Sequence, residues 1–350
     1  ESLLFFFKKE ATSSFISFLL LRAGLNPTFI VGGDVEDFGG NAHVGDGDLF
    51  VAEADESDSS FLMLSPSFEV VTNIEEEHLD HYKTFANLKD AFFKYIQNIR
   101  DGGWLLACGD EGTIKNILLT KRENIKAHVI TYGIGSFNTI YASNIHTDND
   151  KKCFDVNFKG KCLGKMKISL LGVHNVKNVL PSIVIGLHYG LKWSQMVEIL
   201  PGFKGVMRRF QIKGKFKGAL VVDDYAHHPT EIKATLQIAD ELKPTRKIAI
   251  FQPHRYTRTE YFAYEFAKAL QNVDIPILLP IYAASEKPIP GVTSELICNH
   301  LKKLGASPIY FKEQEEVIDY LKKTVKSKDI VLTIGAGNVY KIGEKLVKSN

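Results

Sequence analysis

Short apolar stretches alternate with longer amphipathic stretches along most of the chain. This pattern predicts parallel sheets flanked by helices, because parallel strands need a crossover connection. In the first half, the stretches that we expect to form strands are 28–31, 49–52, 70–72, 104–107 and 128–132. The stretches that we expect to form helices there are 13–23, 87–99 and 111–119.

Residues 138–170 have a different pattern, in which apolar and polar residues alternate one by one. Turn-forming Asp-Asn-Asp and Lys-Gly segments separate the alternating stretches, which are 140–145, 152–158 and 164–170. They predict a small antiparallel sheet inserted in the first domain. A helix over 175–189 then closes that domain, and Pro181 predicts either a kink or the true start of the helix.

The segment 201–205 contains proline and glycine and predicts a linker between domains at 1–202 and 203–350. A second α/β series follows, which we expect to be Rossmann-like. Its predicted strands are 219–223, 247–251, 276–279, 308–311 and 330–333. Its predicted helices are 230–242, 261–269, 293–304 and 313–325.

The charge balance points to a small-molecule site. Lys and Arg number 43 against 41 Asp and Glu, which gives no electrostatic case for nucleic acid or an anionic membrane. No apolar run is long enough to span a bilayer. The four cysteines form no CxxC pair, which favours free thiols in a reducing cytoplasm.

Polar side chains follow several predicted strands of the second domain, where ligands of parallel sheets usually bind. Residues 224–228 follow one strand and residues 252–255 follow the next. Arg255 and Arg258, three residues apart, could converge on one carboxylate, although a solvated basic loop is an equal alternative.

Acidic residues follow the strands of the first domain. The segment 53–58 suits Mg²⁺, which prefers oxygen ligands, or it is a solvated acidic loop. His78 follows the next strand with three glutamates before it, which leaves a transition-metal site as an alternative.

Two further segments have a binding and a structural interpretation each. Asn175 and Asn178 lie one helical turn apart, so their amides could face a nucleotide base, or Asn175 could be a helix cap. Arg208 and Arg209 follow the linker and could reach a phosphate, or they form a surface basic pair.

Taken together, these segments resemble the Mur ligases, in the branch that adds L-alanine to UDP-N-acetylmuramate. The similar segments cover almost the whole chain in the family's order. They read VAEADESD (51–58), LSP (64–66), VVTNIEEEHLDHY (70–82), GVHNVKN (172–178), RRF (208–210), VDDYAHHPTEI (222–232), FQPHRYTRT (251–259), IYAASEKPIPG (281–291) and IGAGNV (334–339).

The resemblance implies a role for each matching position. It implies Mg²⁺ ligands at Glu53 and His78, adenine contacts at Asn175 and Asn178, and ATP contacts at Lys9, Arg209 and Asp224. The positions that it implies for the amino-acid substrate are Tyr225, His227, His228, Arg255 and Arg258. Among all of these, the implied catalytic groups are Lys9, His227, Arg209 and Asp224.

The implied reaction consumes ATP in two steps. ATP phosphorylates the muramate carboxylate, and the amine of alanine then displaces phosphate. The resemblance also implies a cytoplasmic enzyme that is a monomer or a weak dimer. A related amino acid in place of alanine is an open alternative.

The chain departs from the family at its start. Family members begin with a Rossmann-like domain that holds the UDP-sugar, whereas this chain starts at the expected first strand of the ATP domain. The family's phosphate loop, close to GTHGKTTT, aligns with residues 5–12, where both glycines are absent and Lys9 matches the phosphate lysine. Three hypotheses follow, namely a ligase fragment with an altered junction, an inactive remnant, and a non-catalytic module that binds a nucleotide or a partner.

Overall fold

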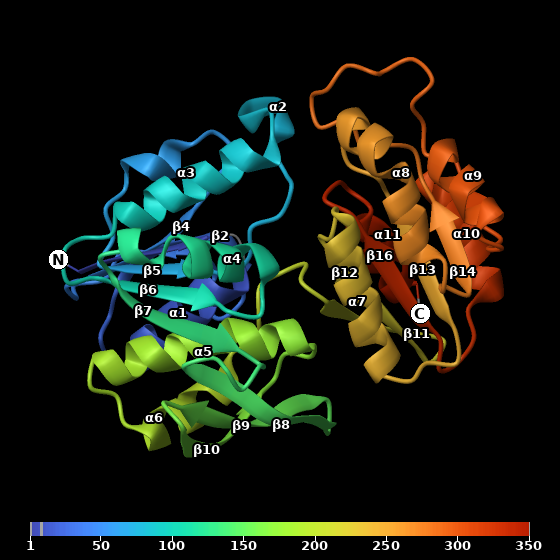
Figure 1. Cartoon of the computed structure of the whole chain (residues 1–350). Helices are drawn as coiled ribbons and strands as arrows, with labels where there is room; N and C mark the ends of the chain where they lie inside the picture. The colour runs from blue at the N-terminus through green and yellow to red at the C-terminus, as the bar shows by residue number, and fades with distance from the viewer. Residues whose placement is uncertain (1, 8–9, 350) are drawn as a thin grey trace. The chain divides into compact units, whose positions relative to one another are not determined.

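The computed structural model describes residues 2–7 and 10–349. The chain divides into two compact units, Glu1–Met207 and Arg208–Asn350. This division falls after Met207, whereas we expected the domain boundary between residues 202 and 203. Each unit has its own sheet and its own helices (Figure 1).

The sheet of the first unit has a parallel centre. Strand β1 (Ser2–Phe7) pairs with β4 (Leu49–Ala54) on one side and with β5 (Phe68–Val71) on the other. The parallel part continues outward through β2 (Thr28–Val35), β6 (Trp104–Cys108) and β7 (His128–Gly133). A short strand β3 (Gly40–His43) pairs antiparallel with β2 at one edge. The strands predicted in this half are therefore confirmed.

The predicted antiparallel strands are also confirmed, and they extend the same sheet. They are β8 (Ile140–Asp148), β9 (Lys151–Phe158) and β10 (Lys161–Ile168). Strand β8 pairs with β7 through Tyr132 and Ile140, which joins the antiparallel part to the parallel part. The strand order is β10-β9-β8-β7-β6-β5-β1-β4-β2-β3.

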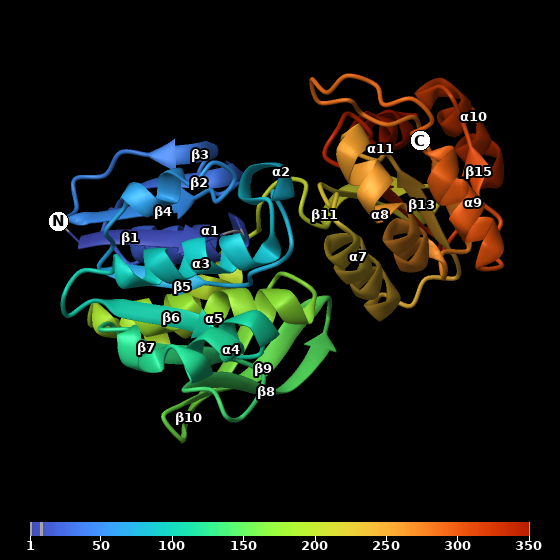
Figure 2. The same ribbon diagram turned by 45° about the horizontal axis from the view of Figure 1, so that its top comes forward.

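Helices cover both faces of this sheet. Helices α1 (Glu10–Arg22) and α5 (Val173–His188) pack against each other on one face, and α3 (Phe85–Gln97) and α4 (Gly112–Thr120) cover the other (Figures 1 and 2). Helix α5 runs through Pro181, so the prediction that Pro181 marks its start was wrong. The remaining short helices are α2 (Leu79–Tyr82), α6 (Trp193–Ile199) and the 3₁₀ turns Ser60–Met63, Arg122–Asn124 and Leu200–Gly202.

The sheet of the second unit has the order β11-β12-β16-β13-β14-β15. Its parallel strands are β12 (Ala219–Asp224), β13 (Lys247–Phe251), β14 (Ile275–Leu278), β15 (Ile309–Tyr310) and β16 (Ile330–Ile334). The helices are α7 (Pro229–Glu241), α8 (Tyr256–Leu270), α9 (Glu295–Lys303), α10 (Gln314–Thr324) and α11 (Tyr340–Lys348). The predicted strands and helices of this half are confirmed.

Several elements were not predicted, namely the strands β3 and β11 and the helices α2, α6 and α11. Strand β11 (Gln211–Phe216) is an antiparallel edge strand with two lysines and a glycine, so its apolar signal is weak. Helix α6 has only 7 residues, too few for its periodicity to stand out. Helix α11 has 9 residues, as many as the predicted helices α4 and α9, so its length does not explain why it was missed.

No helix in the described part of the chain is both long enough and apolar enough to cross a membrane. All four cysteines are free thiols.

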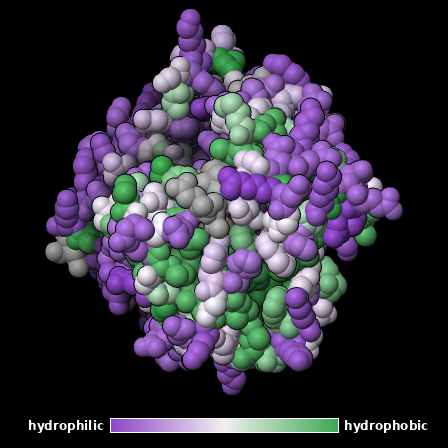
Figure 3. Space-filling view, turned by 90° about the vertical axis from the view of Figure 1, so that its left-hand side faces the viewer, coloured by the Kyte–Doolittle hydropathy of each residue, from purple (hydrophilic) through white to green (hydrophobic). Residues whose placement is uncertain are grey.

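On the side of the first unit where β1 begins, apolar side chains gather in the lower half of the view with polar side chains around them (Figure 3). The strands begin on this side, so the candidate residues that follow their carboxyl ends lie away from it.

Glu69 of β5 is a carboxyl group in the core of the first unit. It is fully buried, and neither of its oxygens has a hydrogen-bond partner among the described residues. Burial raises the pKa of Glu69 well above its ordinary value of 4.5. Burial therefore favours the protonated form of Glu69 in the folded chain.

We predict that Glu69 makes the stability of the first unit depend on pH. Above pH 4.5 the unfolded chain releases the Glu69 proton while the folded chain retains it, so the free energy of unfolding should fall as pH rises. Glu69→Gln should flatten this dependence. Urea unfolding followed by tryptophan fluorescence measures it, because Trp104 and Trp193 both lie in the first unit.

The matched control is Glu198→Gln, since Glu198 is exposed on helix α6 of the same unit. This control should leave the pH dependence unchanged. Equal pH dependence in the Glu69→Gln variant and the parent chain would show that Glu69 ionises freely in the fold.

Candidate active site

Glu53 is held at the carboxyl end of β4 by two neighbouring elements. Its Oε2 atom accepts a hydrogen bond from the Ser13 hydroxyl of α1 at 2.7 Å and from the Gly32 amide of β2 at 2.9 Å. These donors fix the orientation of one of the two predicted Mg²⁺ ligands, and they bring the start of α1 close to it.

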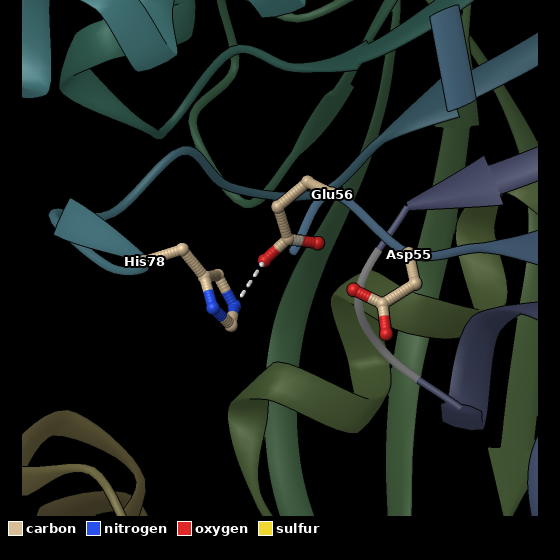
Figure 4. A group of neighbouring side chains, drawn as sticks. All are labelled: Asp55, Glu56 and His78. Carbon is tan, nitrogen blue, oxygen red and sulfur yellow. Dashed lines mark ion pairs between the residues drawn. The ribbon is translucent and has the colours of Figure 1, made fainter. Parts of the chain in front are cut away.

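His78, the other predicted Mg²⁺ ligand, lies beside two carboxylates. Its Nε2 atom lies 3.3 Å from Oε1 of Glu56 and 3.8 Å from Oε2 of Glu77. Glu56 is buried, with 3% of its surface exposed. Figure 4 shows the Glu56 carboxylate between His78 and Asp55.

Several contacts hold the loop after β4 against the segment around α2. The Tyr82 hydroxyl donates to the backbone carbonyl of Glu56, and the Ser59 hydroxyl lies 2.8 Å from Nε2 of His81. Ser59 and His78 both adopt left-handed backbone conformations, with φ of 64° and 54°. Such strained residues persist only where the surrounding contacts compensate, and they are common at functional sites.

Asp55, Glu56 and His78 have the chemistry of a divalent-cation site. One ligand atom from each of these three side chains lies within 4.8 Å of the others. Two carboxylates suit Mg²⁺, and the imidazole nitrogen also suits Mn²⁺ or Zn²⁺. The residues present therefore fit a metal ion, with Glu56 beside the predicted His78.

Asn175 and Asn178 lie near the start of α5, and both are buried. The Asn175 amide donates to the carbonyl of Leu171 at 2.7 Å, and the Asn178 amide donates to Oδ1 of Asn175 at 3.4 Å. The shared face expected from their spacing is thus present. The interpretation of Asn175 as a helix cap was wrong, because Gly172 occupies the N-cap position.

Lys9, the predicted phosphate lysine, lies outside the described residues. The segment that departs from the family's phosphate loop spans residues 5–11. Within it, strand β1 ends at Phe7 and α1 begins at Glu10.

Asp224 organises the start of the second unit's site. Its Oδ1 accepts from the amide of Ala226 at 2.8 Å, and its Oδ2 accepts from the amide of Phe210 at 3.0 Å and the hydroxyl of Thr235 at 2.9 Å. Burial raises the pKa of Asp224 to about 6, although the nearby Arg209 opposes the shift. Asp224 is thus ionised at neutral pH. Its carboxylate fixes the backbone at Phe210, next to Arg209, and at Ala226.

His227 lies between Tyr225 and an acidic side chain. Its Nδ1 atom lies 3.1 Å from the carbonyl oxygen of Tyr225 and 3.7 Å from Oε2 of Glu231. Burial lowers the pKa of His227 and Glu231 opposes this, while Arg258 lowers it further. A neutral imidazole with its proton on Nδ1 would leave Nε2 as a proton acceptor.

Glu231 is the negative charge among these groups. Its Oε2 accepts from the amides of His227 at 3.0 Å and His228 at 3.3 Å. Burial opposes its ionisation, but His227, Arg209 and the two amides outweigh burial and lower the pKa of Glu231 to about 2. Glu231 therefore stays ionised throughout the physiological pH range.

His228, a predicted substrate contact, has a structural position. It is the N-cap of α7, and its Nδ1 atom accepts from the amide of Thr230 at 3.4 Å. Its ring packs edge-on against Phe262 with the centroids 4.9 Å apart.

Arg258 and His254 form a second pair at the end of β13. The Arg258 Nη1 atom lies 3.1 Å from Nδ1 of His254. Burial lowers the pKa of His254 to about 4, with a further contribution from Arg258. His254 is therefore neutral at pH 7 and accepts a hydrogen bond from the guanidinium group. Its ring stacks on Tyr282 with the centroids 5.7 Å apart.

Arg255 is the N-cap of helix α8 and has a positive φ of 72°, and its amide donates to the carbonyl of Tyr282 at 2.8 Å. Glu286 covers the first turn of this helix by accepting from the amides of Tyr256 and Thr257. The guanidinium group of Arg255 is among the charges that lower the pKa of Glu286, against the effect of burial. Arg255, as the N-cap, and Arg258 therefore both lie at the first turn of helix α8.

Four residues near the candidate groups were not singled out from the sequence. They are Glu56, Glu231, His254 and Glu286. The spacing of His228 and Glu231 is that of a capping box, which could have identified Glu231. Glu286 lies about thirty residues from the helix that it caps, so no local pattern connects the two.

Comparison with known proteins covers both units. Residues 40–186 match the Mur ligase middle domain, and residues 208–337 match the domain described as Mur ligase, glutamate ligase domain. The family model for the middle domain therefore spans most of the first unit, and the other spans most of the second.

Named relatives agree with these matches. The UDP-N-acetylmuramate–L-alanine ligase of Carboxydothermus hydrogenoformans is 41% identical over 97% of this chain and 72% of its own length. The enzyme of the same name from Geotalea uraniireducens is 41% identical over 97% of this chain and 74% of its own length. A solved UDP-N-acetylmuramate–alanine ligase of Thermotoga maritima has a TM-score of 0.82 and 26% identity, and the match covers 100% of this chain and 75% of that one.

We predict that Glu56 contributes to divalent-cation binding. Glu56→Gln should weaken Mn²⁺ binding by about ten-fold, because it removes the buried charge beside His78. Electron paramagnetic resonance of free Mn²⁺ measures the affinity. Glu76→Gln is the matched control, since Glu76 is an exposed acid on the same segment and should have no effect. Unchanged affinity in the Glu56→Gln variant would remove Glu56 from the site.

Proposed function

The chain belongs to the Mur ligase family, and we propose that it joins L-alanine to the carboxylate of UDP-N-acetylmuramate with consumption of ATP. The names and 41% identity of the relatives support this reaction in peptidoglycan precursor synthesis. The structural observation that carries the proposal is the position of His227, whose imidazole lies among cationic groups at the carboxyl end of β12. The free cysteines fit a reducing cytoplasm.

The reaction requires activation of a carboxylate. An oxygen of the muramate carboxylate attacks the γ-phosphorus of ATP, ADP leaves, and an acyl phosphate forms. The amine of alanine then attacks the acyl carbon, the C–O bond to phosphate breaks, and phosphate leaves with the proton that the nitrogen loses on forming the amide. A bound Mg²⁺ would supply positive charge to the phosphate oxygens, and the residues that would hold it are His78 with Glu56, Asp55 or the predicted Glu53.

The attack requires an uncharged amine, whereas free alanine carries an ammonium group. With the Nδ1 proton of His227 donated to the Tyr225 carbonyl, Nε2 can accept one proton from this ammonium group. Glu231, 3.7 Å from the ring, then stabilises the imidazolium that forms. We therefore assign the general base to His227.

Arginines would hold the substrate's anionic groups. We propose that Arg255 and Arg258 bind the carboxylate of alanine, in agreement with their shared helical turn. Arg209 would contact the phosphates, and Asn175 and Asn178 the adenine. Lys9 would contact the phosphates as well, and His228 would support this site by capping α7.

The altered segment 5–11 favours a second candidate function. A phosphate loop needs glycines so that backbone amides converge on the phosphates, and this segment has none. The chain would then be a ligase homologue that acts only by binding a nucleotide or a partner. ATP binding and turnover separate the two functions.

We predict that alanine-dependent release of phosphate from ATP requires UDP-N-acetylmuramate in this chain.

Arg258→Lys should raise the KM for alanine by about ten-fold or more, since lysine cannot form the bidentate pair. Arg246→Lys is the matched control, because Arg246 pairs with Asp329 elsewhere in the same unit. Equal KM values in the two variants would remove Arg258 from the alanine site. A clear preference for glycine or serine would contradict the alanine assignment.

We also predict the effect of restoring the phosphate loop. Replacing residues 5–11 with GTHGKTT supplies the missing glycines and should strengthen Mg²⁺–ATP binding in calorimetric titration. Because residues 5–7 belong to strand β1, circular dichroism must first show that the restored chain is folded. If the parent chain binds no ATP and the restored chain gains none, the enzyme interpretation falls and the non-catalytic function stands.

A further inference from the structure

Arg208 is the first residue of the second unit, and its side chain is tied to two strands of that unit. Its Nε atom donates to Oδ2 of Asp223 at 2.9 Å, and its Nη2 atom donates to the carbonyl of Gly335 at 2.7 Å. The Asp223 side chain has 0% exposure, and its other oxygen accepts from the Thr333 hydroxyl at 2.6 Å. The guanidinium group therefore joins the ends of β12 and β16.

Two aromatic rings flank the same guanidinium group. Its central carbon lies 4.9 Å from the ring centroid of Tyr225 and 4.6 Å from that of Tyr340. Contacts of this kind attract a cation to a ring face and restrict the ring as well. Arg208 thus restrains Tyr225, one of the positions that the resemblance implies for the amino-acid substrate.

The backbone around Arg208 is fixed by the same residues. Its carbonyl accepts from the amide of Tyr225 at 2.6 Å, and its amide donates to Oε1 of Gln211 at 3.1 Å. Arg208 and Phe210 both adopt left-handed conformations, with φ of 60° and 44°. Side chains rarely favour this conformation, so contacts on both sides must hold the segment.

Arg209 lies between these two held residues. Its guanidinium carbon lies 5.4 Å from the centroid of the Tyr225 ring. Its positive charge favours lower pKa values at Asp224, Glu231 and His227. Arg209 therefore belongs with these three ionisable side chains in the candidate site. Any movement of Arg208 would therefore displace Arg209 relative to that group.

We propose that Arg208 is a positioning residue for the ligase reaction, because its ties to Asp223 and Gly335 hold Arg209 and the Tyr225 ring in place. The proposal rests on the proposed function. Arg208 acts through its neighbours, since its own charge is paired with Asp223. The Arg208–Arg209 pair thus has divided roles, one structural and one directed at the phosphates.

The chain offers a closely matched control for this pair. Arg246 also donates to a carboxylate with 0% exposure, that of Asp329, and to a backbone carbonyl, that of Thr324. The side-chain exposures of Arg208 and Arg246 are 21% and 26%. The two arginines therefore differ mainly in their neighbours.

The experiment compares Arg208→Lys and Arg246→Lys in the full chain. Arg208→Lys should speed amide hydrogen exchange at Phe210 and Tyr225, and it should lower kcat by about ten-fold with the KM for ATP changed less than about two-fold. Arg246→Lys should speed exchange near residues 245 and 330 and leave kcat unchanged. Thr333→Val, which removes the donor to Asp223, should have a smaller effect in the same direction as Arg208→Lys.

The outcomes separate this proposal from the proposed function. Equal kcat in the two lysine variants would overturn the positioning role while the ligase function stands. Unchanged exchange at Phe210 and Tyr225 in Arg208→Lys would overturn it whether or not the chain turns over. A parent chain without alanine-dependent turnover would contradict the proposed function, and hydrogen exchange would still decide whether Arg208 holds the segment. If Arg208→Lys does not fold, equal kcat in Thr333→Val and the parent would overturn the proposal.

Discussion

Backbone pairing between parallel strands sets where each strand of the two sheets ends, and this constraint places the candidate residues of both units. In the first unit, β1 pairs with β4 and β5, so Phe7 ends beside Ala54 and Val71. The loops after β4 and β5 therefore start at one edge, which allows Glu56 and His78 to meet at 3.3 Å. The site thus follows from strand pairing rather than from nearness in sequence.

Charge balance is the main property of the site in the second unit. Arg209, Arg258 and Arg255 are positive, and each has a described acidic neighbour in its electrostatic surroundings, such as Glu231 or Glu286. His227 and His254 contribute no charge at pH 7, because burial and the nearby guanidinium groups lower their pKa values. A site with fixed cations and neutral imidazoles can bind anionic groups and still accept a proton, which is what amide-bond formation requires.

The sequence predicted the alternation of strands and helices well, because buried parallel strands are continuous apolar runs, as in residues 248–251 of β13. It did not predict β11, because the two lysines and the glycine of this edge strand leave it without a clear apolar pattern. Among the candidate residues, spacing indicated the shared face of Asn175 and Asn178. It could not indicate that Glu56 turns toward His78, because side-chain direction within an acidic loop depends on contacts such as that of Tyr82.

The central claim is that ATP activates a carboxylate before the amine attacks. The most direct measurement uses UDP-N-acetylmuramate labelled with ¹⁸O in its carboxylate, followed by mass spectrometry of the phosphate released in the presence of alanine. An acyl phosphate passes one carboxylate oxygen to the leaving phosphate, so the account predicts one ¹⁸O atom per phosphate. Alanine-dependent phosphate that contains no ¹⁸O would contradict it.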